Sequence, residues 1–313
     1  MKGLEISKSF YEEYGKELFQ NEFKDIKDKI AVGLAGSGSE CLGFDDEISR
    51  DHDFEPGFCI FLPGEDIVDR KTAFQLERAY YKLPREYMGL KRSLVSPVGG
   101  NRNGVIRTAD FYLSKVGAPD GNLSVQQWLT IPEHYLCEAV NGEVFEDNYG
   151  EFTKIRNTLL NMPESVRLKR IAGSVILMAQ AGQYNYERCM KHKETGSAQL
   201  AAIDFAKNAM KTVFLLNKKY MPFYKWSFRA MRNLEILPEL ADTLEYLISS
   251  ENDEDTAETK QLVIEDAAVM IINEMQNQGI TKAMCTNLET HAYSVNDSIE
   301  DSEIRNMSIF AAV

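Results

Sequence analysis

Two aspartates separated by one residue are the strongest candidates for chemistry in this sequence. Asp51 and Asp53 flank His52 and precede the apolar run Gly57–Pro63. In an extended segment, residues two apart point to the same side, so both carboxylates can converge on one point. Carboxylate oxygens are the ligands that hard divalent cations prefer. The pair therefore predicts a site for Mg²⁺ or Mn²⁺.

A glycine-serine turn precedes the aspartates. The stretch AGSGSECLG runs from Ala35 to Gly43 and contains two Gly-Ser pairs. Glycine permits close approach to the backbone, and backbone N–H groups and hydroxyls bind phosphate oxygens. A phosphate cradle beside a divalent cation is the minimum that nucleotidyl transfer needs, because metal ions stabilise the attacking and leaving oxygens.

These residues resemble the nucleotidyltransferase superfamily, which includes kanamycin nucleotidyltransferase, polymerase beta and the poly(A) polymerases. Its signature is a hydrophobic strand, Gly-Ser, a loop, and then Asp-x-Asp entering the next strand. The longer string GSECLGFDDEISRDHDF resembles more specifically one bacterial branch of that superfamily, whose members are known only as a domain of unknown function. The similarity continues through Trp128–Asp147 and Tyr220–Trp226, so it covers most of the chain.

The resemblance implies roles for the residues that match the signature. Asp51 and Asp53 would be catalytic and would bind the metal ions. Gly38 and Ser39 would hold the nucleotide phosphates. This second Gly-Ser pair is favoured over the first because Gly43 then falls where many members of the superfamily place a loop glycine.

A third carboxylate is usual in the superfamily, on a later strand. The matching segment GVIRT has no acid, so Asp110 is the nearest candidate for this catalytic role. Its alternative is a first-turn acid that interacts with a helix dipole. Three further acids are weaker alternatives: Glu143, Glu146 and Asp147.

Further nucleotide contacts are expected from two other segments. Arg50 would either neutralise a phosphate or pair with nearby acids. Lys225 would bind the triphosphate, as helical-domain lysines do in related enzymes, and Tyr224 would stack on the base. The alternative for YMPFYKW, residues 220–226, is an aromatic contact between helices.

The elements that must position these residues follow from periodicity. Short apolar runs predict strands at Ile30–Gly36, Gly57–Pro63 and Gly104–Thr108. Helical spacing predicts helices over Glu5–Ile30, Arg70–Leu83, Met162–Tyr186, Ala198–Lys219 and roughly Thr259–Gln278.

This pattern predicts an α+β protein of two domains. Residues 1–122 would form a nucleotidyltransferase-type mixed sheet with helices, and residues 123–313 a helical bundle with an acidic connector near 249–258. Two long amphipathic helices joined by a short turn favour an antiparallel bundle. The active site would lie in the cleft between the domains.

Charge is unevenly distributed along the 313 residues. The formal net charge is −13, yet residues 154–232 carry fifteen Lys or Arg against four Asp or Glu. Residues 251–313 carry three against thirteen. A basic segment facing acids suits a polyphosphate, although mutual attraction of two solvated surfaces explains it equally well. The basic segment permits RNA as a partner, and the overall acidity argues against DNA.

Localisation follows from what the sequence lacks. No run approaches the roughly 18 apolar residues of a membrane span, and the N-terminus does not have the apolar core of a secretory signal. The five cysteines are scattered and odd in number. We therefore expect a cytoplasmic protein with unpaired thiols and no membrane partner.

The expected function is transfer of a nucleoside monophosphate from an NTP to an acceptor hydroxyl, with release of pyrophosphate. The acceptor is a small molecule, an RNA or a protein. One alternative is a catalytically weak, nucleotide-binding regulatory protein of the same fold, which the missing third carboxylate favours. Another is an antibiotic adenylyltransferase, which requires an acidic pocket for a cationic drug.

Overall fold

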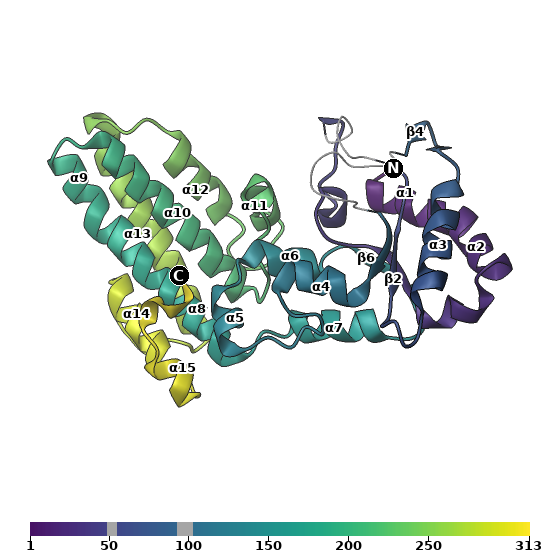
Figure 1. Ribbon diagram of the computed structural model, residues 1–313. Coiled ribbons are helices and arrows are strands. Elements are labelled where there is room, and N and C mark those ends of the chain that lie inside the picture. The colour runs from purple at the N-terminus through teal and green to yellow at the C-terminus, as the bar shows by residue number, and fades with distance from the viewer. Residues whose placement is uncertain (49–54, 93–102) are drawn as a thin grey trace. The chain divides into compact units, whose positions relative to one another are not determined.

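The computed structural model describes residues 1–48, 55–92 and 103–313 and contains two compact units (Figure 1). Unit 1 consists of residues 1–123 and 135–161, and unit 2 of residues 124–134 and 162–313. The chain therefore leaves unit 1, contributes a short segment to unit 2 and returns. The predicted site residues Arg50, Asp51 and Asp53 lie outside the described residues.

A four-stranded mixed sheet forms the centre of unit 1. The strand order is β5 (Gly104–Arg107), β2 (Cys59–Leu62), β1 (Ala31–Leu34) and β6 (Glu143–Asp147). β1 is antiparallel to β2 and β6, whereas β2 and β5 are parallel. The three predicted strands are confirmed. β6 was not predicted, because the sequence pattern indicates a helical bundle over residues 123–313.

Helices cover both faces of this sheet (Figure 1). On one face, α1 (Gly3–Phe10) and α3 (Arg70–Lys82) pack against Ile60 and Phe58 in an apolar core. Phe61 points to the other face, because side chains alternate along a strand. There its ring stacks on Phe152 of α7 (Glu151–Leu160) with centroids 4.0 Å apart, and it meets Phe111 of α4 (Thr108–Val116) edge-on.

The prediction of one continuous N-terminal helix over Glu5–Ile30 is wrong, because the chain forms several shorter segments there. After α1, the chain forms a π-helical turn, η1 (Tyr11–Gly15), and then α2 (Lys16–Asn21). Phe23 leaves helical geometry with φ −129° and ψ 39°, and a 3₁₀ segment, η2 (Lys24–Lys29), leads into β1. The amphipathic pattern persists across these breaks because all these segments pack against the same core.

The smaller elements of unit 1 connect the strands. They are η3 (Glu40–Leu42), the hairpin of β3 (Glu86–Tyr87) and β4 (Leu90–Lys91), and α6 (Glu133–Val140), which begins in unit 2 and continues into unit 1.

Unit 2 is helical in its described residues. Its elements are α5 (Val125–Thr130), α8 (Glu164–Met178), η5 (Ala179–Tyr186), α9 (Glu187–Lys191), α10 (Thr195–Leu216), α11 (Tyr224–Met231), α12 (Leu240–Ser249), α13 (Glu254–Asn277), α14 (Leu288–Asp297), α15 (Ser302–Asn306) and η6 (Ile309–Ala312). The two long predicted helices are confirmed as α8 with η5 and as α10, and they pack side by side. The α+β fold class, a mixed sheet followed by a helical region, is thereby confirmed.

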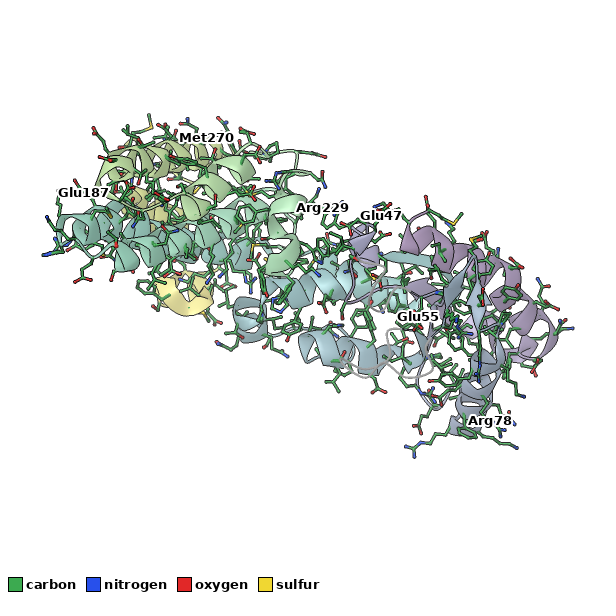
Figure 2. All side chains as sticks on the ribbon, turned by 90° about the horizontal axis from the view of Figure 1, so that it is seen from above. Glu47, Glu55, Arg78, Glu187, Arg229 and Met270 are labelled. Carbon is green, nitrogen blue, oxygen red and sulfur yellow. The ribbon has the colours of Figure 1, made fainter. Side chains whose placement is uncertain are left out.

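Many charged side chains of this helical unit are exposed, although a few, such as Lys169 and Lys260, are buried. Figure 2 shows Glu187 of α9 and Arg229 of α11 pointing away from the helices, while apolar residues such as Val175 and Phe205 are fully buried. The acidic segment 249–258 is only partly a connector. α13 begins at Glu254, and the Asp253 side chain accepts a hydrogen bond from the backbone N–H of Thr256. Acids favour a helix N-terminus, which explains this difference from the prediction.

In the described residues, no helix has both the length and the apolar character that crossing a membrane requires. The five cysteines all lie within those residues, and none of them forms a disulfide bond.

Candidate functional site

The turn after β1 is held in a fixed shape. Gly36 and Gly38 have φ angles of +108° and +128°, in the left-handed region that favours glycine. The backbone N–H of Gly36 donates to Asn141 Oδ1 at 2.8 Å, and Asn141 Nδ2 donates to the carbonyl oxygen of Gly36 at 2.8 Å. One carboxamide thus fixes both backbone groups of Gly36, so this part of the turn is preorganised.

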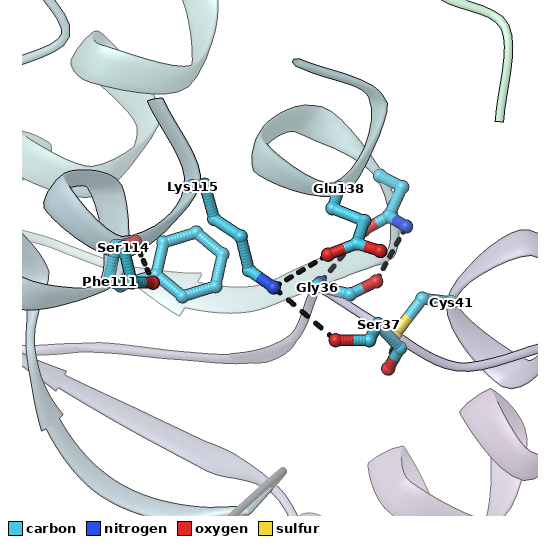
Figure 3. A network of polar contacts seen from close by, with 8 residues as sticks. Gly36, Ser37, Cys41, Phe111, Ser114, Lys115 and Glu138 are labelled. Atoms are coloured by element: carbon cyan, nitrogen blue, oxygen red, sulfur yellow. Dashed lines mark hydrogen bonds and ion pairs between the residues drawn. The ribbon is translucent and has the colours of Figure 1, made fainter. Parts of the chain in front are cut away.

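A lysine lies beside this turn. Lys115, in the last turn of α4, donates from Nζ to Glu138 Oε2 at 2.6 Å and to Ser37 Oγ at 3.3 Å (Figure 3). The side chains of Lys115 and Glu138 are only 16% and 20% exposed. Partial burial reduces screening by water, so the charge of Lys115 acts more strongly on a nearby anion than a surface lysine would.

A cavity of about 310 Å³ adjoins the turn and the lysine. It lies at the lower end of the volumes typical of ligand sites, roughly 300–1,000 Å³. Its lining comes from the turn, the first residue of β2, Asn103, the first three residues of β5, and α4: Ala35, Gly36, Ser37, Cys59, Asn103, Gly104, Val105, Ile106, Phe111, Ser114 and Lys115. Polar groups, one cation and apolar side chains therefore line the same cavity.

Cys59 is not a nucleophile in this cavity. The residue is buried, and burial raises the pKa of its thiol to about 12. The thiolate is the reactive form of cysteine, and at neutral pH this thiol stays protonated.

The two predicted phosphate-binding pairs have different surroundings. Gly36 and Ser37 line the cavity, whereas Gly38 and Ser39 are not among its lining residues. Ser39 precedes η3, and the carboxylate of Glu40 occupies the space that a Cβ at position 38 would need. Of the two pairs, the first is the one that the described structure brings to the cavity and to the lysine.

Asp110 lies in the first turn of α4 and is exposed. It does not line the described cavity. The position fits the alternative reading, since an acid in the first turn interacts favourably with the helix dipole.

The other three acids have structural partners. Glu143 pairs with Lys8 at 2.6 Å, and Glu146 lies 3.9 Å from Lys16. The Asp147 carboxylate accepts two backbone N–H groups at the start of α7, each at 2.8 Å. These contacts fasten β6 and α7 within unit 1.

Tyr224 and Lys225 begin α11 in unit 2. Tyr224 is 76% exposed, and its ring lies 4.3 Å from that of Phe223. The Nζ of Lys225 lies 5.1 Å from the centre of the Trp226 ring. Phe223, which precedes α11, also meets the ring of His134 of α6 edge-on, with centroids 5.6 Å apart. This segment therefore makes an aromatic contact with another helix, which is the alternative that the sequence left open. Binding of nucleotide by Tyr224 and Lys225 stays a prediction.

Among the residues that the structure describes, no three His, Cys, Asp or Glu side chains gather closely enough to hold a metal ion. Asp45, which precedes the predicted pair, instead anchors its loop to α1, since its Oδ2 accepts the backbone N–H of Gly3 at 2.9 Å. The donor chemistry of Asp51 and Asp53 suits Mg²⁺. Metal binding by Asp51 and Asp53, which lie outside the described residues, stays a prediction.

The chain is similar to one protein family and to one solved structure described below. Residues 128–227, less than half of the chain, match the family model of a domain of unknown function (DUF4037). A crystal structure of a nucleotidyltransferase-like protein from Exiguobacterium sibiricum 255-15 is similar over 93% of this chain and 89% of that chain, with 12% sequence identity and a TM-score of 0.35. A similarity at that TM-score carries no argument about fold or activity. No curated protein sequence matches the chain.

Proposed function

We propose that this protein is a metal-dependent nucleotidyltransferase that moves a nucleoside monophosphate from an NTP to an acceptor hydroxyl and releases pyrophosphate. One observation carries the proposal: a Gly-Ser turn fixed by Asn141 borders a cavity together with a partly buried lysine, Lys115. A preorganised turn and a cation at one cavity are the arrangement that binds phosphate oxygens.

The roles of the described residues follow from their contacts. The Ser37 hydroxyl and the Lys115 ammonium would donate hydrogen bonds to phosphate oxygens. The two groups are close enough to bind the same phosphate, since Lys115 Nζ lies 3.3 Å from Ser37 Oγ at the cavity. Glu138, which pairs with Lys115 at 2.6 Å, would be displaced from it by a phosphate oxygen. As charge develops on the phosphate during transfer, a fixed cation stabilises it without reorganisation of solvent.

The remaining roles rest on the sequence. Asp51 and Asp53 would hold Mg²⁺ or Mn²⁺, which when bound would neutralise phosphate charge and stabilise the leaving oxygen. Gly38, Ser39 and Arg50 are further proposed phosphate contacts. In unit 2, Lys225 and Tyr224 are proposed contacts to the triphosphate and the base.

A second candidate function is nucleotide binding with little turnover. It is favoured by β5, whose residues Gly104–Arg107 contain no acid, and by the exposed position of Asp110 outside the cavity lining. Such a protein would bind NTP without releasing pyrophosphate, so the two candidates differ in one product.

The test is a transfer assay. Purified protein is incubated with each α-³²P-labelled NTP, Mg²⁺ or Mn²⁺ and cell extract, and label on any acceptor is measured together with pyrophosphate. We expect labelling by the wild type and by Lys8→Met, a control that removes one lysine of unit 1 outside the cavity. The double variant Asp51→Asn with Asp53→Asn should lose about 10³-fold in rate. Equal labelling by that double variant would remove the proposed role of the pair.

A further inference from the structure

A second hollow lies wholly within unit 2, between η5 and α10. Its volume is about 470 Å³, within the roughly 300–1,000 Å³ of small-molecule sites. Leu177, Ala181 and Leu200 give it an apolar side, while Asn185 and Lys211 are among its polar residues. Leu200 is 66% exposed, so apolar surface is available to a ligand there.

The helix that forms one wall is not a regular α-helix. Between α8 and α9 the chain adopts eight residues of π-helix, Ala179–Tyr186, without leaving the helical axis. Gln180, Ala181 and Asn185 of this segment line the hollow. π-Helical turns are rare and occur frequently at functional sites, because the wider turn displaces side chains from their regular positions.

Buried charge adjoins this hollow through Lys211. On its inner side Lys211 faces Glu133 and Arg170, which are 8% and 5% exposed and form an ion pair at 3.5 Å. Burial lowers the pKa of Lys211 and of Arg170, against the attraction of Glu133, which raises both. In the described part of the chain, Arg170 Nε has no hydrogen-bond partner.

On the open side, Lys207 lies one helical turn before Lys211. Its Nζ is 4.0 Å from Asp204, and both side chains are more than half exposed. Of the charged side chains that line the hollow, two are cations, Lys207 and Lys211, and one is a carboxylate, Asp204. An excess of cationic side chains beside a hollow attracts an anion.

Asn208, between the two lysines, adds a second sign of an incomplete site. The residue is 6% exposed and lines the hollow. Its Nδ2 donates to the Asp204 carbonyl oxygen at 2.8 Å, whereas its Oδ1 is buried without a partner among the described residues. Unsatisfied buried polar atoms are uncommon in native proteins, and this oxygen, which can only accept, marks the place of a water or of a ligand group that donates a hydrogen bond.

We propose that this hollow is a binding site for a small phosphate monoester with an apolar body. The phosphate would lie between Lys207 and Lys211, and the apolar body would contact Leu177 and Leu200. The site is separate from the Gly-Ser turn and does not depend on the proposed function.

Phenyl phosphate is a suitable probe, with inorganic phosphate as the head group alone, and isothermal titration calorimetry measures both. We expect one phenyl phosphate to bind the wild type with a Kd of roughly 1 mM or tighter. Lys207→Met should weaken this binding about tenfold, because it removes a charge-assisted hydrogen bond. Leu200→Gln should weaken phenyl phosphate and leave inorganic phosphate unchanged.

Matched controls come from the same unit. Lys191→Met removes an exposed lysine of α9 that does not line the hollow, and Leu262→Gln removes an exposed leucine of α13. Both should bind phenyl phosphate like the wild type. Lys207 and Leu200 are exposed, so their variants should fold. Absence of binding to the wild type, or equal weakening in the controls, would overturn the proposal.

Discussion

Two lysines, one in each unit, have opposite surroundings. In unit 2, Lys169 of α8 is completely buried, and its Nζ donates to Asn296 Oδ1 at 2.7 Å and to the carbonyl oxygens of Met307 at 2.6 Å and Arg305 at 3.3 Å. In unit 1, Lys115 lies at a cavity, where its described partners are one carboxylate and one hydroxyl.

This difference separates a structural lysine from one available to a ligand. The three acceptors of Lys169 are fixed by the fold, and through them Lys169 fastens α14 and the segment that follows it to α8. The carboxylate partner of Lys115 belongs to a side chain, which a phosphate can displace. Residue type alone does not distinguish the two lysines; the nature of the acceptors and the adjoining space do.

Removing the buried lysine should have the largest effect. Lys169→Met leaves three acceptors without their donor, so we expect the free energy of unfolding to fall by about 3 kcal/mol. Urea denaturation followed by circular dichroism measures this change. A loss below about 1 kcal/mol would show that these hydrogen bonds do not hold the C-terminal segment, and the comparison would fail on the structural side.

Removing the cavity lysine should change binding rather than stability. Lys115→Met is expected to weaken NTP·Mg²⁺ binding about tenfold, which corresponds to about 1.4 kcal/mol. The free energy of unfolding should change by less than about 1 kcal/mol, since the ion pair is not fully buried. Glu138→Gln should bind NTP at least as tightly as the wild type, because the competing carboxylate charge is gone. Equal affinity of Lys115→Met and wild type contradicts the role of Lys115.

The pH dependence of the free energy of unfolding tests the buried ion pair of Glu133 and Arg170 in unit 2. Burial raises the pKa of this carboxyl group above its ordinary 4.5, against the attraction of Arg170. The native state therefore binds more protons than the unfolded state above pH 4.5, and stability falls as pH rises toward the native pKa. Glu133→Gln removes the titrating group, so the free energy of unfolding should fall less steeply with pH in this variant than in the wild type. Urea midpoints at pH 5, 6 and 7 measure it, and an unchanged slope contradicts the assignment.

Removing an exposed lysine should have the smallest effect on the free energy of unfolding. Lys191 pairs with Glu187 one turn away at 2.7 Å, with both side chains more than half exposed. Lys191→Met should change the free energy of unfolding by no more than about 0.5 kcal/mol and leave NTP binding unchanged. A larger effect would mean that exposure does not rank these lysines as we suggest.

Local patterns made much of the fold predictable. The apolar runs correctly give β1, β2 and β5, and 3.6-residue periodicity gives α3, α8, α10 and α13. β6 escaped prediction because EVFED is short and carries three acids, and its pairing with β1 joins residues more than 100 positions apart. Periodicity also did not reveal the breaks between α1, η1 and α2, since one apolar face continues across them.

The candidate site was predictable only where one segment carries it. The Gly-Ser turn is visible in the sequence because its residues are adjacent. Lys115, Glu138 and Asn141 come from α4, the end of α6 and the residue after α6, and only the folded unit brings them to Gly36. Their types give no signal of this role, because lysines and acids on helices are usually solvated.

Hydrogen–deuterium exchange with and without saturating NTP·Mg²⁺ tests the central claim most directly. If the turn after β1 receives the phosphates, peptides that cover Ala35–Gly43 and the end of α4 will exchange more slowly with nucleotide present. If nucleotide binds and these peptides exchange at an unchanged rate, or if none of the four NTPs binds, the account of this site is contradicted.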